Sequence, residues 1–196
     1  MQSEREKRIV VGCGIFEAEL RKVLEDDHRF DYQFHWLKSG YHARMDLLAS
    51  KLSESLEDVE LADLENLRIL YGGSCLFDVD EAVKKGLKIL PSDNCLTAMV
   101  GRNKLREMEK GRTMVVTSSW IRKIYLVDDE DEFPLWSPEE MRMNLGRYDR
   151  ILVLDAGVDE FSDEEILTAF DRMGVVLEFE KCSLNYFRGL IYDFMT

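Results

Sequence analysis

The sequence is poor in proline, cysteine and positive charge, and it lacks long hydrophobic runs. Only 3 prolines and 4 cysteines occur in 196 residues, and 26 basic residues stand against 39 acidic ones, for a net charge of -13. Nucleic acid and anionic membrane surfaces attract a clustered basic face, so neither is expected as a partner. No apolar run approaches the roughly 20 residues of a spanning helix, and the start MQSEREKR has no apolar segment of a secretion signal. These absences predict a cytoplasmic protein.

The chain does contain enough apolar material for one sizeable core. Hydrophobic residues make up 45% and charged residues 33% of the sequence, which is ordinary for a single domain of this length. We therefore expect one domain over residues 1–196. A reducing compartment keeps thiols free, so the four cysteines are expected to be free thiols or metal ligands rather than disulfides.

Short β-branched runs alternate with amphipathic stretches along the whole chain. Residues 9–11 predict a strand and residues 16–24 a helix; residues 113–117 and 163–173 repeat this pair of patterns further on. No internal repeat or low-complexity linker interrupts the alternation. The pattern predicts the α/β class, as a single layered domain whose central, mainly parallel sheet of about six strands is flanked by helices.

Three cysteines follow predicted strands. Cys13 ends the first strand, Cys75 lies in the loop YGGSC, and Cys95 lies in PSDNC. The carboxyl ends of parallel strands lie along one edge of a sheet, so these thiols are expected to converge. Cys95 should occupy the first turn of a helix, where exposed amides lower a thiol pKa and favour the thiolate. Cys182 is expected to be a small buried hydrophobe that stands apart.

Three further residues are expected at the same edge. His42 precedes a long helix predicted over residues 45–56, Trp120 follows the fifth strand, and Asp155 follows the sixth. A lone histidine is more often structural than functional, but its position makes His42 a candidate ligand or proton donor. Asp155 is a candidate residue for orienting His42 or a substrate. Trp120 is expected to cover one wall of the site. The glycines of the first loop do not indicate nucleotide binding, because Glu17 stands where the motif has a third glycine.

These landmarks resemble the domain of unknown function 1638 family of anaerobic archaea and bacteria. The similarity extends over most of the chain to Asp155, although some members carry aspartate in place of Asn94 and glycine in place of Ser119. The resemblance implies an unassigned activity. It also implies a link to methyl metabolism, because members often occur beside corrinoid-dependent methyl-transfer proteins. The residues that carry it are Cys13, His42, Tyr71, Gly72, Cys75, Asn94, Cys95, Thr117 and Trp120.

The expected chemistry of the thiols leaves several functions open. Thiolates select zinc, copper(I) or iron in sulfide clusters, and the sequence lacks the closely spaced cysteine pairs of structural zinc sites. Three single cysteines suit an iron–sulfur cluster, expected as a 4Fe–4S cluster with one iron open to a small substrate, or an open zinc site. One alternative is a metal-free enzyme with Cys95 as nucleophile and His42 as base. Another is a non-catalytic module that holds a small molecule or a corrinoid or methyltransferase protein.

Overall fold

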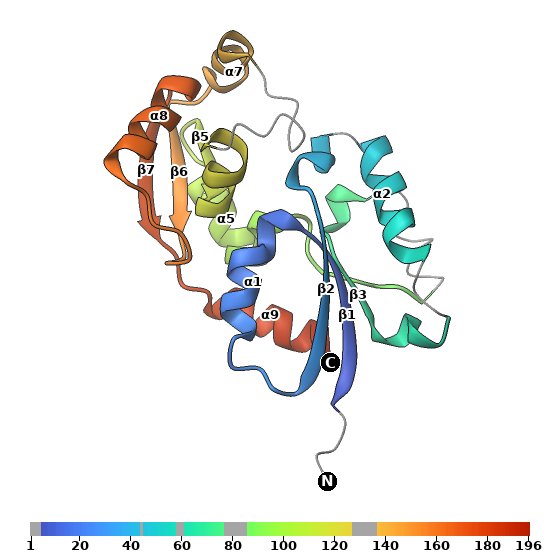
Figure 1. The fold of residues 1–196 in the computed structure, drawn as a ribbon. Helices are drawn as coiled ribbons and strands as arrows, with labels where there is room; N and C mark the ends of the chain where they lie inside the picture. Colours follow the sequence, from blue (N-terminus) through green and yellow to red (C-terminus); the bar gives the residue numbers. More distant parts are fainter. Residues whose placement is uncertain (1–4, 44, 58–60, 77–85, 127–136) are drawn as a thin grey trace.

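The computed structural model describes residues 5–43, 45–57, 61–76, 86–126 and 137–196. Within these residues, strands and helices alternate from one end to the other (Figure 1). The strands are β1 (Glu6–Cys13), β2 (Phe30–Leu37), β3 (Leu67–Leu70), β4 (Lys88–Ile89), β5 (Thr113–Thr117), β6 (Arg150–Asp155) and β7 (Val176–Lys181). The helices are α1 (Glu17–Leu24), α2 (Met45–Glu57), α4 (Cys95–Val100), α5 (Arg102–Met108), α6 (Ser118–Trp120), α7 (Pro138–Leu145), α8 (Asp163–Met173) and α9 (Asn185–Met195).

Five short segments of tighter or wider helix connect these elements. They are η1 (Gly14–Phe16), η2 (Ser39–Ala43), η3 (Leu61–Asn66), η4 (Gly73–Cys75) and the π-helical η5 (Ile121–Leu126). Asp78 and Glu81 form a sequence pattern that predicts a helix start, and residues 128–132 form an acidic stretch that predicts a loop; both lie outside the described residues. No helix in the described part of the chain combines the length and the apolarity needed to cross a bilayer.

The strands form two parallel sheets, ordered β2-β1-β3-β4 and β5-β6-β7. Every pairing in both sheets is parallel, which confirms the predicted α/β class. The prediction of one central sheet was wrong. β4 has only two residues and therefore offers few backbone groups for a further strand. The chain then passes through α4 and α5, two helices that are separated by Gly101 (φ 81°). The second sheet begins after these helices, with β5.

Local sequence signals explain the helix boundaries of the second half. The side chains of Ser137 and Ser162 each accept a hydrogen bond from the backbone N–H three residues later. The glutamate side chain at that later position accepts one from the backbone N–H of the serine, as in a capping box. α8 ends at Gly174, which adopts the left-handed conformation (φ 68°) that glycine accepts at low cost. The helix predicted over residues 163–173 is thereby confirmed.

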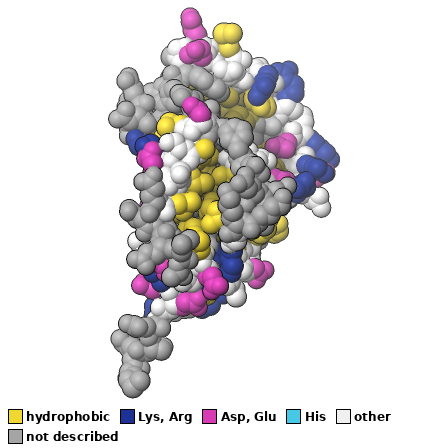
Figure 2. Space-filling view, turned by 90° about the vertical axis from the view of Figure 1, so that its right-hand side faces the viewer, with side chains coloured by type: hydrophobic (Ala, Val, Ile, Leu, Met, Phe, Trp, Pro, Cys, Tyr) yellow, Lys and Arg dark blue, Asp and Glu magenta, His cyan; other side chains and the backbone are white. Residues whose placement is uncertain are grey.

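The face of the molecule that carries α2 is partly apolar. Figure 2 shows hydrophobic side chains gathered at the centre of this face. A cavity of about 240 Å³ lies here, between α2 and the residues that follow β3. Its lining consists of Leu48, Ala49, Leu52, Ser53, Leu56, Cys75 and Leu76. Cys75 thus lies beside an apolar space of the size of a small molecule.

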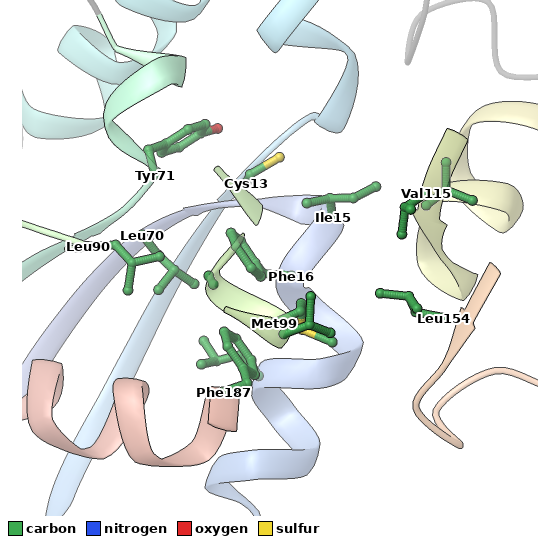
Figure 3. Close-up of a cluster of buried hydrophobic side chains, with 14 of the residues drawn as sticks. Cys13, Ile15, Phe16, Leu70, Tyr71, Leu90, Met99, Val115, Leu154 and Phe187 are labelled. Atoms are coloured by element: carbon green, nitrogen blue, oxygen red, sulfur yellow. The ribbon is translucent and has the colours of Figure 1, made fainter. Parts of the chain in front are cut away.

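The last helix returns to the first sheet and closes its core. The ring of Phe187 in α9 stacks on that of Phe16, with centroids 5.5 Å apart (Figure 3). At the end of α9, Arg8 Nε donates to Met195 O and Arg68 Nε donates to Phe194 O, both at 2.8 Å. These hydrogen bonds therefore attach the last turn of α9 to the amino end of the first sheet.

Candidate functional site

The loops that carry Cys75 and Cys95 are joined by their backbones. Gly73 N–H donates to Ser92 O, and Ser74 N–H donates to Asp93 O, each at 2.8 Å. The loops approach so closely at Gly72 that a Cβ atom there would lie 2.4 Å from Asp93 O. Only glycine fits at position 72, whereas a Cβ atom at Gly73 would have room, 3.9 Å from Ser92 O. The structure thus brings together two thiol-bearing segments separated by about 20 residues of sequence.

Cys13 lies at the end of β1, beside the end of β3. Its neighbour Gly12 pairs with Leu70, and the next residue of that strand end is Tyr71. Cys13 and Tyr71 are both buried, and the hydroxyl end of Tyr71 is directed towards Cys13 (Figure 3). Burial, and then a negative charge at Cys13, raise the pKa of Tyr71 far above its usual range. The Cys13 sulfur lies within hydrogen-bonding reach of the Tyr71 hydroxyl and contributes to this rise. The contact lacks good hydrogen-bond geometry, and the hydroxyl has no other partner within the described parts of the chain.

The three thiols are close enough to influence one another electrostatically. Burial raises the pKa of Cys13 to about 11, and a negative charge at Cys75 adds to this shift. Burial also raises the pKa of Cys95 to about 12, with further contributions from charges at Cys13 and Cys75. The pKa of Cys75 is raised by burial as well. All three are therefore neutral thiols near pH 7, in one shared neighbourhood.

The predicted thiolate at Cys95 is wrong, although its predicted location is right. Cys95 opens α4, and the side chain of Asn94 caps this helix by accepting a hydrogen bond from Thr97 N–H at 2.9 Å. Backbone amides at Leu96 and Cys95 do lower the pKa, as expected for a helix start, but burial outweighs them. The residue as a whole is half-buried, while loss of water around the sulfur dominates its titration. A helix of six residues also offers only a small dipole.

The thiols do not stand in metal-binding geometry as they lie. Among the described residues, no three histidine, cysteine, aspartate or glutamate side chains are placed to hold a metal ion. His42 lies in η2, but its side chain is not among those that the structure describes. A metal bound by Cys13, Cys75 and Cys95 would therefore require a change in the positions of these thiols.

Asp155 and Cys182 lie together at the carboxyl end of the second sheet. Cys182 N–H donates to Asp155 O at 2.7 Å, and the Asp155 carboxylate accepts from Gly157 N–H at 2.8 Å. Cys182 is buried, with its sulfur 3.7 Å from Ser183 O. The causes that raise its pKa are burial and nearby carboxylates, with no other cysteine among them.

Trp120 lies where the two sheets meet. It belongs to α6, which follows β5 and contacts η1, the segment directly after Cys13. Its backbone N–H donates to Thr117 Oγ1 at 3.2 Å, so the strand end caps the short helix. Lys123 strengthens the same junction, because its Nζ donates to Gly14 O at 2.8 Å. The carboxyl ends of β1 and β5 thus lie against each other.

Two polar residues at this junction were not predicted from the sequence. Glu19 in α1 and Ser119 in α6 are each 1% exposed, and they hydrogen-bond to each other. A signal for Glu19 was present, since it lies three residues after Phe16 and four before Val23, on the apolar face of α1. A carboxylate in that position needs a buried partner, which Ser119 supplies.

The comparisons with known proteins support a single assignment. Residues 36–191 match the family model described as a protein of unknown function (DUF1638). No curated protein and no solved structure matches the chain. The match spans more than half of the chain and includes the loops of Cys75 and Cys95, whereas Cys13 precedes it.

Proposed function

Because the chain belongs to the DUF1638 family, whose function is unknown, we propose its function from its site: Cys13, Cys75 and Cys95 bind a thiophilic group and present it to a small substrate. The thiophilic group is a soft metal ion or an iron–sulfur cluster, because clustered sulfur ligands select such groups. Zinc in an open coordination is the second choice.

One observation carries this proposal: the buried Tyr71 hydroxyl faces the buried Cys13 thiol in poor hydrogen-bond geometry and has no other partner among the described residues. Leaving such a group unpaired costs about 1–3 kcal/mol, so a buried orphan hydroxyl calls for a functional explanation. A bound group that accepts a hydrogen bond here would remove this cost. The same group would be held by the neighbouring sulfurs.

The neutral state of the thiols makes metal binding at such a site depend on pH. Metal binding to cysteine displaces the thiol proton, so binding couples to pH and is expected to strengthen as pH rises. The surroundings that raise the pKa values of Cys13 and Cys95 also exclude water, and an oxygen-sensitive cluster benefits from that shielding. The cavity beside Cys75 offers room for a small substrate.

The remaining candidate residues take supporting roles in this proposal. His42 is the fourth ligand or a proton donor, Asp155 orients His42 or the substrate, and Trp120 covers one wall of the site. The family resemblance further suggests corrinoid or methyltransferase proteins as partners in methyl metabolism. Binding of purified corrinoid protein, measured with and without the loaded thiol site, would test this last step.

The decisive experiment is metal analysis of anaerobically purified and reconstituted protein. We expect bound iron and sulfide, or zinc, in the wild-type chain. Serine variants of Cys13, Cys75 and Cys95 should each lose the metal and any cluster absorbance. The matched control is Cys182→Ser, which should retain both. Equal binding by all four variants, or no binding by the wild type, contradicts the proposal.

A metal-free thiol enzyme is the alternative with a clear signature. It requires one thiol with a low pKa, which rapid alkylation of a single cysteine near pH 7 would reveal. The raised pKa of Cys95 argues against it. If the chain binds no metal and no thiol reacts quickly, a non-catalytic module that holds a small molecule or a corrinoid protein becomes the better account.

A further inference from the structure

Three carboxylate oxygens surround one hydroxyl at the junction of the two sheets. Ser119 Oγ lies 3.0 and 3.1 Å from the two oxygens of Glu19, and 3.1 Å from Asp159 Oδ2. Glu19 belongs to α1 of the first half, whereas Ser119 and Asp159 follow β5 and β6 of the second sheet. Glu19 and Ser119 are almost inaccessible to water. This buried contact therefore joins the two halves of the fold.

The number of protons at this junction follows from hydrogen-bond geometry. A serine hydroxyl has one proton, so it donates to one carboxylate only. Its contact with the second carboxyl group requires that this group donate a proton to the hydroxyl oxygen. Asp159 is the better anion, because its Oδ1 lies 3.2 Å from Arg122 Nε. The proton therefore resides on Glu19.

We propose that Glu19, Ser119 and Asp159 form a proton-dependent latch between the two sheets, in which Glu19 donates to Ser119 and Ser119 donates to Asp159. Loss of the Glu19 proton leaves two carboxylates competing for one hydroxyl, and the latch weakens. The latch joins α1, which begins four residues after Cys13, to α6, which contains Trp120. Protonation of Glu19 thus controls how firmly the carboxyl ends of the two sheets are held together.

The electrostatic surroundings agree with this proton count. Burial raises the pKa of Glu19 to about 7, and the charge of Asp159 contributes to the rise. The Lys123 ammonium opposes it. A Ser119 hydroxyl that donated to Glu19 would also lower this pKa, whereas in the latch the hydroxyl accepts from Glu19. Cys182, which follows β7, is close enough for the charge of Glu19 to raise its pKa. Lys123 does not neutralise Glu19 by direct pairing, because its Nζ contacts Gly14 O and, at 3.3 Å, Glu17. Near-neutral pH therefore lies within the working range of the latch.

The sign of the effect on stability follows from the raised pKa. The native state holds the Glu19 proton up to about pH 7, while an unfolded chain releases it near pH 4.5. The contribution of the latch is complete below about pH 4.5 and is lost as the pH rises through 7. Across that window, Glu19 lowers the folding equilibrium constant by roughly 300-fold.

Carbon-13 NMR of glutamate carboxyl groups, together with urea unfolding from pH 4 to 8, tests the proposal on the full chain. We expect one carboxyl resonance that titrates near pH 7 in wild type and is absent in Glu19→Gln. The glutamine amide can still donate to Ser119, so this variant should lose the stability change between pH 4.5 and 7. Glu25→Gln, at an exposed position at the end of the same helix, is the matched control and should behave as wild type. Titration of Glu19 below pH 5, or an unchanged pH dependence in Glu19→Gln, overturns the latch.

Ser119→Ala provides a second test if Glu19→Gln does not fold. In the latch Glu19 donates to Ser119, so removal of the hydroxyl takes a hydrogen bond from the protonated carboxyl group and should move the Glu19 titration to lower pH. A titration that stays in place, or moves up, contradicts the hydrogen-bond order in the latch. Neither test involves a metal, so the latch and the thiol site stand or fall separately.

Discussion

At the amino end of the first sheet the buried polar groups are charged and fully hydrogen-bonded, whereas at its carboxyl end they are neutral and short of partners. Arg68 is completely buried, yet its guanidinium donates to the carbonyls of Phe194 and Glu65. At the other end, Trp36 Nε1 has no partner within the described residues, and Tyr71 Oη has none besides its poorly aligned contact with the Cys13 sulfur. The amino end of the sheet therefore stabilises the fold, whereas the carboxyl end contains buried polar groups that are short of hydrogen-bond partners.

This difference helps to separate structural from functional residues. A buried charge is tolerated only when its hydrogen bonds are made. Arg8 and Arg68 therefore indicate that the amino end of the first sheet serves to stabilise the fold. A buried polar group without a partner costs stability and indicates a ligand or a reaction. Trp36 directly precedes Leu37, which pairs with Cys13 at the carboxyl ends of β2 and β1. Tyr71 directly follows the last residue of β3.

The largest effect is expected at the amino end, for Arg68→Met. The variant leaves the Phe194 and Glu65 carbonyls without their donor and loses the anchor of α9, so the free energy of unfolding should fall by roughly 3 kcal/mol. Arg21→Met, which removes an exposed pair with Glu17, is the control and should cost about 0.5 kcal/mol or less. Urea unfolding measures both. Equal losses in the two variants would remove the contrast between the ends of the sheet.

The second effect concerns the carboxyl end, for Gly72→Ala. The new methyl group would collide with Asp93 O and separate the Cys75 and Cys95 loops, so stability should fall by about 2 kcal/mol. Gly73→Ala is the matched control, because a Cβ there lies 3.9 Å from its nearest neighbour, Ser92 O. Thermal unfolding and metal binding should both change in the first variant and remain near wild type in the second. A tolerated Gly72→Ala would show that the two loops need not touch.

A smaller effect depends on pH and concerns Asp27, near the amino end of β2. Hydrogen bonds from Arg29, and also from Tyr32, lower the pKa of Asp27 to about 2. Ionised Asp27 therefore contributes stability that is present above about pH 3.8 and is lost as the pH falls through 2. The contribution should be on the order of 1–2 kcal/mol, reduced because Arg29 is partly exposed. Unfolding of wild type and Asp27→Asn between pH 2 and 6 measures it, and parallel curves would contradict it.

The smallest change is expected for Tyr71→Phe, and its sign is the informative part. Removal of an unpaired buried hydroxyl should leave the ligand-free protein as stable as before or more stable by up to about 1 kcal/mol. Tyr32→Phe is the control, because the Tyr32 hydroxyl donates to Asp27 at 2.7 Å, and its removal should cost about 1 kcal/mol. If Tyr71→Phe is the more destabilising of the two, the Tyr71 hydroxyl already has a partner and the main support for the thiol site is lost.

Much of the fold could be predicted from local patterns. The β-branched run of β5 and the capping residues of α8 fixed these elements to within a residue or two, because hydrophobic periodicity and capping act over short distances. The division into two sheets could not be predicted in this way. The division into two sheets depends on the length of β4 and on the helix break at Gly101. Hydrophobic periodicity predicts neither of these features.

The candidate site shows the same division. The positions of Cys75 and Cys95 after successive strands follow from the sequence, and the structure joins their loops as parallel topology requires. Their state of ionisation did not follow, because a helix start lowers a thiol pKa while burial raises it. The roles of His42, Trp120 and Asp155 stay predictions.

The sequence by itself determined the class of the fold, the order of its strands and helices along the chain, and the placement of single cysteines after strands. Only the tertiary structure decided that the thiols are neutral, that the Tyr71 hydroxyl is unpaired, and that Glu19 shares a hydroxyl with Asp159. The physical reason is the range of the interactions involved. Periodicity and capping act within about one helical turn, whereas burial and proton sharing depend on which distant segments exclude water from a group.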